Sequence, residues 1–294
     1  MKYEYTRAAF GRHSFIEVEK NVKLHISDLG KGEPIVFIHG LPFNNTMFEY
    51  QHQFFVKTGY RVISISLRGF GFSDKPYGKY NYNVFADDIK IILETLEVDN
   101  AMLVGFSTGA AAAIRYASRY NGAHINKLVL CSAAVPFLAE KYEPMSIALN
   151  QNIEELIRLI NSDHPAFFKK FAGLCAGNNQ FVLSNIIPWF DNIYTQASPY
   201  AIEQGLLLLR DAALYTDLKE TTLPAAIFHG KKDEVFPFDL AERLYDLIPH
   251  AWFVPFENSG HALFLEEMEK FNLSLMKFMR LGIAKQAAAA SLYY

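Results

Sequence analysis

Residues 103–109 read LVGFSTG, and they place Ser107 in a G-x-S-x-G pattern that four alanines follow. The pattern comes after an apolar run typical of a strand and opens a segment of helical period, the setting that exposes a nucleophilic serine on a sharp turn. Gly105 and Gly109 would let neighbouring backbone approach this turn closely. The N-terminus of the following helix would present free N–H groups to an oxyanion beside Ser107. A packing turn of small residues is the alternative interpretation of the same letters.

A serine hydroxyl is a poor nucleophile without a base, so a histidine is required. Of the nine histidines, His261 is the candidate, because it lies in ENSGH between the last predicted strand and the last predicted helix. His39 and His229 end predicted strands before glycines, where local hydrogen bonding is the simpler role. The other histidines show no supporting pattern.

A third group must orient the imidazole and stabilise its charged form. Asp233 follows the predicted strand 225–229 in HGKKDEVFP, with Glu234 and Asp246 as competitors. Glu234 lies one residue further along, and Asp246 belongs to a predicted helix. The chain order Ser107, Asp233, His261 is the order expected for this kind of serine turn.

Acyl transfer also needs donors for the oxyanion. One is expected to be the N–H of Thr108. The other is expected from the loop HGLPF after the predicted strand 34–38, where Pro42 has no N–H. Leu41 is therefore the second predicted donor, with Phe43 as the lesser alternative. An ordinary strand-ending turn is the competing interpretation of this loop.

Short β-branched apolar runs alternate with segments of helical period, which predicts an α/β fold with a mostly parallel eight-stranded sheet and helices on both faces. The first two strands are expected to form an antiparallel hairpin that turns near residues 20–21. The predicted strands are Ser14–Val18, Val22–Ser27, Pro34–Ile38, Arg61–Ser66, Ala101–Phe106, Lys127–Ala133, Ala225–His229 and Trp252–Glu257. The predicted helices between and after them are residues 45–57, 83–97, 107–120, 239–248 and 263–280.

Residues 136–217 break this rhythm, because they are helical, aromatic and interrupted by prolines. An insertion of this length between parallel strands predicts a helical cap over the C-terminal edge of the sheet, where open α/β sheets bind ligands. The chain is thus predicted to consist of a first core part, 1–135, the cap, 136–217, and a second core part, 218–294. Two rival interpretations of residues 136–217 are a separate second domain and one long irregular crossover. An apolar substrate pocket is expected to involve Pro42, Phe43, Phe106 and Trp189.

The composition is 51% hydrophobic and 15% aromatic over 294 residues, enough for one large core. The formal charge of −3, without a basic stripe, argues against a nucleic-acid partner. The sequence carries no apolar run long enough to span a membrane and no apolar segment typical of a secretory signal. Cys131 and Cys175 are expected to be buried thiols in a reducing compartment, which predicts a cytoplasmic protein. Neither a metal nor an organic cofactor is expected, and the sequence does not indicate the oligomeric state.

Across roughly residues 16–279 the sequence resembles the α/β-hydrolase superfamily, through the motifs FIHGLP, RGFGFSDKP, LVGFSTG, FHGKKDEVFP and ENSGH. Within it, the sequence is most similar to the cofactor-free bacterial haloperoxidases, or perhydrolases, and to aryl esterases. The resemblance implies Ser107 as nucleophile, Asp233 as acid, His261 as base, and the N–H groups of Leu41 and Thr108 as oxyanion donors.

The resemblance also implies a peroxide reaction, because in that family the proline after the oxyanion residue is associated with peracid formation, and Pro42 matches it. Two positions depart from the family pattern. Ser66 stands where relatives usually have Asp, and alanines follow the serine turn where relatives often have glycines and an acidic residue.

The sequence therefore predicts a serine esterase that acts on small carboxylic esters or lactones, with peracid formation as a side activity. A small-molecule ester is the expected partner. Two other functions stay open. A small-molecule receptor on the same fold would show single-turnover hydrolysis, and a scaffolding protein would leave Ser107 unlabelled by a fluorophosphonate probe.

Overall fold

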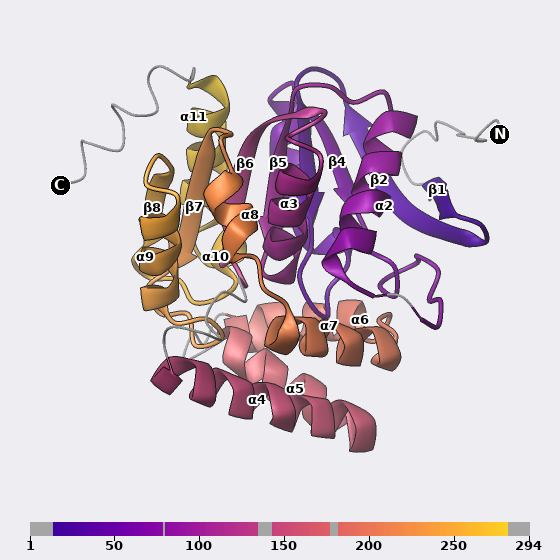
Figure 1. The fold of residues 1–294 in the computed structure, drawn as a ribbon, viewed down its shortest axis with the longest axis vertical. Coiled ribbons are helices and arrows are strands. Elements are labelled where there is room, and N and C mark those ends of the chain that lie inside the picture. Colours follow the sequence, from indigo (N-terminus) through magenta and orange to yellow (C-terminus); the bar gives the residue numbers. More distant parts are fainter. Residues whose placement is uncertain (1–13, 79, 135–142, 177–181, 282–294) are drawn as a thin grey trace.

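The computed structural model describes residues 14–78, 80–134, 143–176 and 182–281, with the backbone alone described at 143–151 and 182–183. Its centre is an eight-stranded sheet in the order β1-β2-β4-β3-β5-β6-β7-β8 (Figure 1). The strands are β1 Ser14–Glu19, β2 Val22–Gly30, β3 Pro34–Ile38, β4 Arg61–Ile65, β5 Ala101–Phe106, β6 Ile125–Cys131, β7 Ala225–Gly230 and β8 Trp252–Phe256. Pairing is antiparallel for β1–β2 and β2–β4, and parallel for all the others. The predicted fold class is confirmed.

The register of the central strands determines which loops meet. Ile38 pairs with Gly105, Phe106 pairs with Cys131, and Cys131 pairs with Phe228. The strands β3, β5, β6, β7 and β8 run in the same direction, so the loops after them start side by side at one edge of the sheet. Residues far apart in the sequence are therefore brought together at this edge.

The helices of the core begin close to the predicted positions, but two of them are interrupted. Residues 45–57 form a 3₁₀ turn, η1 Asn45–Phe48, before α1 Glu49–Lys57, with the Asn44 side chain accepting the Thr46 N–H at 2.9 Å. The predicted helix 263–280 splits into α10 Leu263–Glu266 and α11 Met268–Arg280. The remaining core helices are α2 Tyr82–Thr95, α3 Thr108–Arg119 and α9 Phe238–Leu247.

The break at Glu267 has a physical reason, because this side chain is used outside the helix. Its carboxylate accepts the Asn258 N–H at 2.9 Å and the Ser259 hydroxyl at 2.7 Å. Glu266 likewise accepts the Gly260 N–H at 3.0 Å. Two consecutive carboxylates thus hold the loop 258–260 immediately before His261, and this set of contacts is called the glutamate clamp below.

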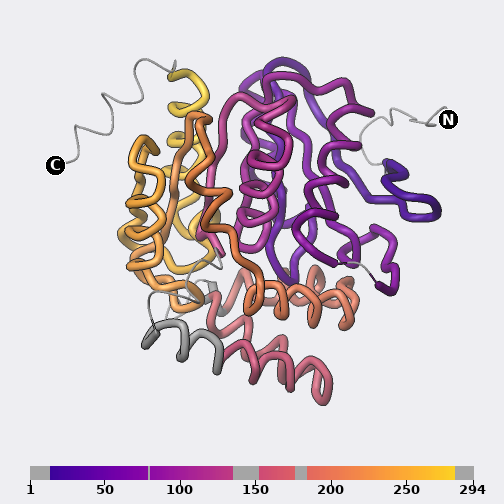
Figure 2. Tube along the Cα trace, in the orientation of Figure 1, coloured from indigo at the N-terminus to yellow at the C-terminus, as the bar shows by residue number. Residues whose placement is uncertain are grey.

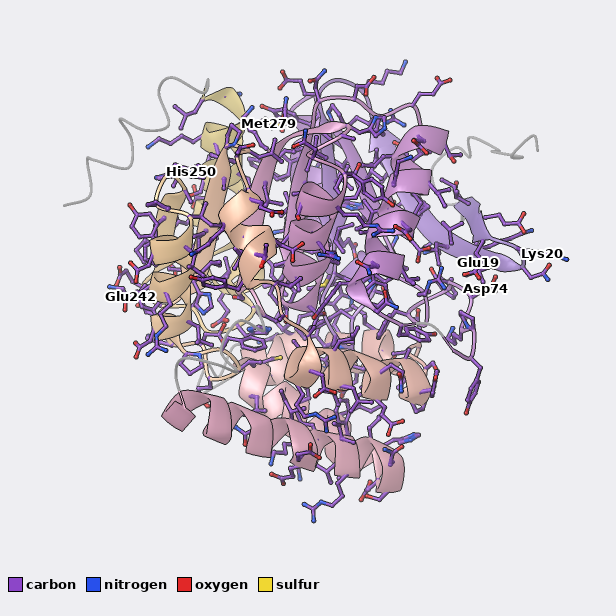
Figure 3. The ribbon with its side chains drawn as sticks, viewed as in Figure 1. Glu19, Lys20, Asp74, Glu242, His250 and Met279 are labelled. Atoms are coloured by element: carbon purple, nitrogen blue, oxygen red, sulfur yellow. The ribbon has the colours of Figure 1, made fainter. Side chains whose placement is uncertain are left out.

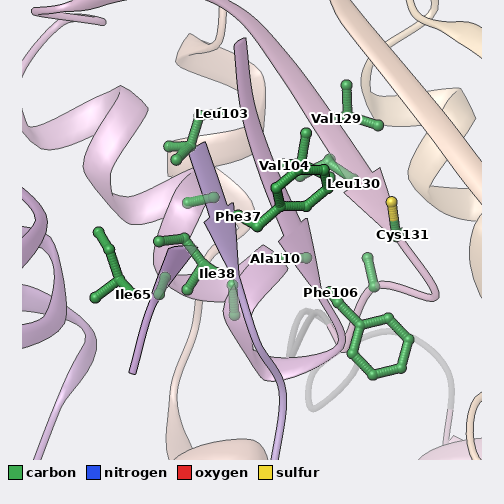
Figure 4. Close-up of a cluster of buried hydrophobic side chains, with 14 of the residues drawn as sticks. Phe37, Ile38, Ile65, Leu103, Val104, Phe106, Ala110, Val129, Leu130 and Cys131 are labelled. Carbon is green, nitrogen blue, oxygen red and sulfur yellow. The ribbon is translucent and has the colours of Figure 1, made fainter. Parts of the chain in front are cut away.

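Strand β5 and helix α3 pack at the centre of the molecule (Figure 4). Every residue of β5 is buried, as expected for a strand covered on both faces. The four alanines 110–113 are completely buried, and the absence of larger side chains lets α3 lie close to the sheet. Phe106 ends β5 beside Cys131 at the end of β6, so the apolar core extends to the edge where the loops meet.

After β6 the chain leaves the sheet and returns through α8 Tyr215–Glu220, which packs against α3, into β7 (Figure 2). Helices α4–α7 lie together below the sheet (Figure 1) and are called the cap helices here. They are α4 Glu143–Ser162, α5 His164–Ala176, α6 Ile187–Tyr194 and α7 Pro199–Asp211, with a π turn at Val182–Ile186. We propose that they form the cap predicted for residues 136–217. The predicted boundary at 135/136 lies outside the described residues.

Lys20 on the β1–β2 hairpin and Glu242 on α9 are exposed at the periphery (Figure 3), whereas Arg68 and Asp88 form a buried ion pair at 2.7 Å. Cys131 and Cys175 are both free and buried. Across the described part of the chain, no helix combines the length and apolar character that a membrane crossing requires.

His39, directly after β3, is neutral in the folded protein. Its Nδ1 donates to the Gly40 carbonyl at 2.9 Å, while its Nε2 accepts the Leu67 N–H at 2.9 Å. The ring is buried, and burial lowers the pKa of His39 to about 4. A second proton would have to displace the Leu67 N–H, so local hydrogen bonding is the role that the structure gives this histidine.

This burial predicts a loss of stability in acid. The unfolded chain takes up a proton on His39 near pH 6.5 and the folded chain near pH 4, so stability is present above pH 6.5 and falls as the pH drops between these values. We expect His39 to account for about 2 kcal/mol of the decrease in unfolding free energy between pH 7 and pH 5. Urea unfolding at pH 7 and at pH 5 measures this difference in unfolding free energy. His39→Gln should flatten this pH dependence and the surface control His250→Gln should not; equal slopes in parent and His39→Gln would contradict the assignment.

Candidate active site

Ser107 occupies the turn between β5 and α3 in a strained conformation. Its φ of 54° and ψ of −121° lie in a region that residues other than glycine rarely adopt. The surrounding backbone holds it there: the Ser107 N–H donates to the Cys131 carbonyl at 2.9 Å, and its carbonyl accepts from Ala110 at 3.0 Å and Ala134 at 3.2 Å. Strain that persists because several contacts enforce it is typical of functional turns.

The two glycines of the pattern are required by close approach of backbone. A Cβ at Gly105 would lie 2.5 Å from the Ala110 Cα. A Cβ at Gly109 would lie 2.4 Å from the His39 carbonyl oxygen. The G-x-S-x-G letters therefore describe a turn packed tightly between β3, β5 and α3.

His261 and Asp233 meet at the same edge of the sheet. The His261 Nδ1 lies 2.8 Å from the Asp233 Oδ2, and both side chains are buried. The other carboxylate oxygen, Oδ1, accepts the N–H groups of Val235 and Phe236, each at 2.9 Å. Burial by itself would raise the pKa of Asp233, but the His261 imidazole and these donors stabilise the charge, and the pKa is lowered.

The second ring nitrogen of His261 is available as a base. Its Nε2 is buried and has no hydrogen-bond partner among the described residues, Ser107 included. The ring is held by Phe106, with centroids 4.9 Å apart, and by Phe236 at 5.6 Å. Because Nδ1 faces a carboxylate, the proton of the neutral ring belongs on Nδ1 and the lone pair on Nε2. A buried lone pair without a donor is the arrangement that a general base needs before it takes a proton.

A cavity of about 40 Å³ opens at Ser107 beneath the cap helices. Its walls come from both sides: Leu41 and Thr108 from the core, side chains of α4, α5 and α7 from the cap helices, and the loop after β7. The cap and loop residues are mainly apolar, namely Asn152, Ile153, Leu156, Phe171, Leu174, Leu206, Leu209, Glu234, Val235 and Phe236.

None of the four residues predicted for the substrate pocket is part of this lining. Phe43 is completely buried, with ring centroids 4.7 Å from Phe190 and 5.0 Å from Tyr194. Phe106 packs against the His261 ring, and Pro42 is buried next to Phe43 in the sequence. Trp189 is half-buried and packs edge-to-face with Tyr50 at 6.0 Å.

The lining that the sequence analysis missed comes from aliphatic residues, chiefly leucines, of α4 and α7. Their helical period was the available signal. Aromatic composition pointed to Phe43, Phe106 and Trp189, which lie outside the lining, although the aromatic residues Phe171 and Phe236 do belong to it. Glu234, considered in the sequence as a competitor of Asp233, contributes instead to the cavity wall.

The predicted oxyanion donors are adjacent. The Leu41 N–H donates to the Thr108 Oγ1 at 2.9 Å. The N–H of Thr108 belongs to the first turn of α3, where helical N–H groups have no carbonyl partner within the helix. The alternative donor, the Phe43 N–H, is already bound to the Gly40 carbonyl at 2.9 Å. Both N–H groups thus have an acceptor, but that of Leu41 is a side-chain hydroxyl, whereas that of Phe43 is a backbone carbonyl that closes a turn, so the geometry favours Leu41 over Phe43.

A mostly parallel sheet, a strained serine between strand and helix, and a carboxylate-bound histidine on later strand ends define an α/β hydrolase. The chain belongs to this family: the sequence profile described as alpha/beta hydrolase fold matches residues 33–268.

Relatives of this chain include proteins named as haloperoxidases and as esterases, the two groups that its motifs resemble. It is 41% identical over 268 residues to the AB hydrolase superfamily protein YisY of Bacillus subtilis, covering 90% of this chain and 98% of the relative. It is 30% identical over 269 residues to the non-heme chloroperoxidase CPO-A1 of Kitasatospora aureofaciens, covering 88% and 96%. The solved structure of an esterase (EaEST) from Exiguobacterium antarcticum superposes with a TM-score of 0.84 at 34% identity, covering 91% of this chain and 99% of that one. The chain is thus a hydrolase of the esterase and haloperoxidase-like group.

Proposed function

We propose that this protein is a serine esterase that cleaves small carboxylic esters through Ser107, His261 and Asp233. The observation that carries the proposal is the His261 ring, which is bound through Nδ1 to a buried carboxylate and leaves Nε2 unpaired at the edge where Ser107 opens into a cavity. The esterase and chloroperoxidase named above support the same class of chemistry.

The proposed reaction begins when His261 Nε2 takes the Ser107 proton and Oγ attacks the ester carbonyl. The N–H groups of Leu41 and Thr108 hold the resulting oxyanion. His261 then returns the proton to the departing alcohol, and a water molecule, activated in the same way, releases the acid from the acyl-enzyme. Asp233 stays ionised throughout and stabilises the imidazolium.

The cavity favours short acyl groups. Its volume of about 40 Å³ corresponds to only a few water molecules, and most of its lining is aliphatic or aromatic. Compact lactones offer the same carbonyl and are included in the proposal. Peracid formation from peroxide is proposed as a side activity, on the strength of Pro42 and of the relative named as a chloroperoxidase.

A panel of p-nitrophenyl esters of increasing acyl length, together with lactones, tests this function with and without hydrogen peroxide. We expect steady multiple turnover, with kcat/KM highest for acetate to butyrate and falling for longer chains. A single equivalent of p-nitrophenol followed by arrest would favour the receptor alternative. No release at all from any ester would contradict the proposal.

A further inference from the structure

Leu41 and Thr108, the two predicted donors of the oxyanion hole, are hydrogen-bonded to each other. The Thr108 side chain accepts the backbone N–H of Leu41, which is one of the two groups expected to bind the oxyanion. The Leu41 N–H donates to the Thr108 hydroxyl oxygen at 2.9 Å, and both residues are buried at the wall of the cavity that contains Ser107. An N–H group pointing at this hydroxyl does not point at a substrate.

The hydroxyl oxygen occupies one of the two donors that an oxyanion would need. An oxyanion must sit at hydrogen-bond distance from both the Leu41 N–H and the Thr108 N–H. The Thr108 Oγ1 accepts the Leu41 N–H at 2.9 Å, so this donor is already engaged by a side chain of the protein. The Leu41 N–H therefore has to release the Thr108 hydroxyl before it can donate fully to an oxyanion.

The Leu41 side of the contact is held in place, which leaves Thr108 as the group that moves. Gly205 on α7 approaches the Leu41 side chain so closely that a Cβ there would lie 2.6 Å from Leu41 Cδ1. The following turn is closed by the bond from the Phe43 N–H to the Gly40 carbonyl. A threonine side chain, in contrast, has three staggered χ1 positions, and the rotation that turns Hβ toward Leu41 takes Oγ1 away without putting the methyl group in its place.

We propose that the Thr108 hydroxyl is a built-in competitor of the oxyanion, which satisfies the Leu41 N–H between turnovers and must rotate away in each catalytic cycle. The proposal rests on the esterase function proposed above. It makes Thr108 a residue with two opposing effects: its N–H stabilises the transition state, while its hydroxyl stabilises the empty hole.

Thr108→Ala tests this by removing the hydroxyl and keeping the N–H. A trifluoromethyl ketone, which forms a tetrahedral oxyanion with a serine, reports the affinity of the hole directly. We expect its inhibition constant to fall by about fivefold and kcat/KM for p-nitrophenyl acetate to rise by a similar factor, the equivalent of one neutral hydrogen bond. The melting temperature should fall, because the Leu41 N–H loses its buried acceptor. Thr108→Ser, whose hydroxyl is less restricted, should give intermediate values in the same directions.

The matched control is Thr58→Ala, which removes a threonine hydroxyl that donates to the Phe54 carbonyl at the end of α1. It should leave both kinetic readouts unchanged. Inhibition by the ketone that is equal or weaker in Thr108→Ala than in the parent would overturn the proposal while leaving the esterase function intact. A parent protein that neither hydrolyses esters nor reacts with a fluorophosphonate would overturn both.

Discussion

Replacing Ser107 by alanine is expected to lower kcat/KM for p-nitrophenyl acetate by about 10⁴-fold or more and to abolish labelling by a fluorophosphonate. The hydroxyl is the proposed nucleophile, and Ser107 lines the cavity in which the ester carbonyl would bind. The residual activity of Ser107→Ala should come from the oxyanion donors and from substrate binding alone.

Stability measurements separate loss of chemistry from loss of structure. The variant keeps the backbone bonds that fix the turn, since these use the N–H and carbonyl of residue 107 and not its hydroxyl. Its melting temperature should therefore stay within a few degrees of the parent. Ser118→Ala, on the helix α3 that follows the turn, is the control and should retain full activity. A Ser107→Ala protein within tenfold of the parent would remove Ser107 from the mechanism.

Asp233→Asn should reduce kcat by about 10³- to 10⁴-fold with little change in KM. The reason lies in the two N–H groups of Val235 and Phe236 that bind Oδ1. These donors orient the amide so that its oxygen faces them and its NH₂ faces His261 Nδ1. The imidazole then carries its proton on Nε2, and it can no longer accept one from Ser107.

Asp246→Asn is the matched control, because Asp246 was a sequence competitor for the same role and is exposed on α9. It should behave as the parent in a pH–rate profile from pH 5 to 9. If Asp246→Asn showed the larger loss, or if Asp233→Asn kept more than a tenth of the parental kcat, the assignment of the acid would be wrong.

Most of the fold was predictable because the sheet and its helices are governed by local periodicity. All eight strands are present, and β3 and β5 have the predicted bounds. The interruption of the last helix was not predictable, since it depends on Glu266 and Glu267 binding a loop that precedes them. Hydrogen bonds of this kind leave no periodic signal in a sequence.

In the candidate site, the three polar residues were predictable from the sequence, and the residues of the cavity wall were not. Ser107, Asp233 and His261 lie at strand ends, and strand order alone brings such positions to one edge; the structure then joins Asp233 to His261 at 2.8 Å. The cavity wall depends on how the cap helices pack, and aromatic residues such as Phe43 and Trp189 are used there for helix packing. The bond between Leu41 and Thr108 likewise requires three-dimensional proximity.

The glutamate clamp has a consequence for how such a hydrolase can diversify. The stretch before His261 is bound by Glu266, the last residue of α10, and by Glu267, which follows it. The His261 carbonyl accepts from the Ser132 hydroxyl, directly after β6, at 3.0 Å. All these anchors belong to the described core and none to α4–α7. Replacement of helices α4–α7 by helices of another shape is therefore expected to leave His261 in place. If His261 is the proposed base, substrate preference can then change in evolution without a change in the residues that transfer the proton.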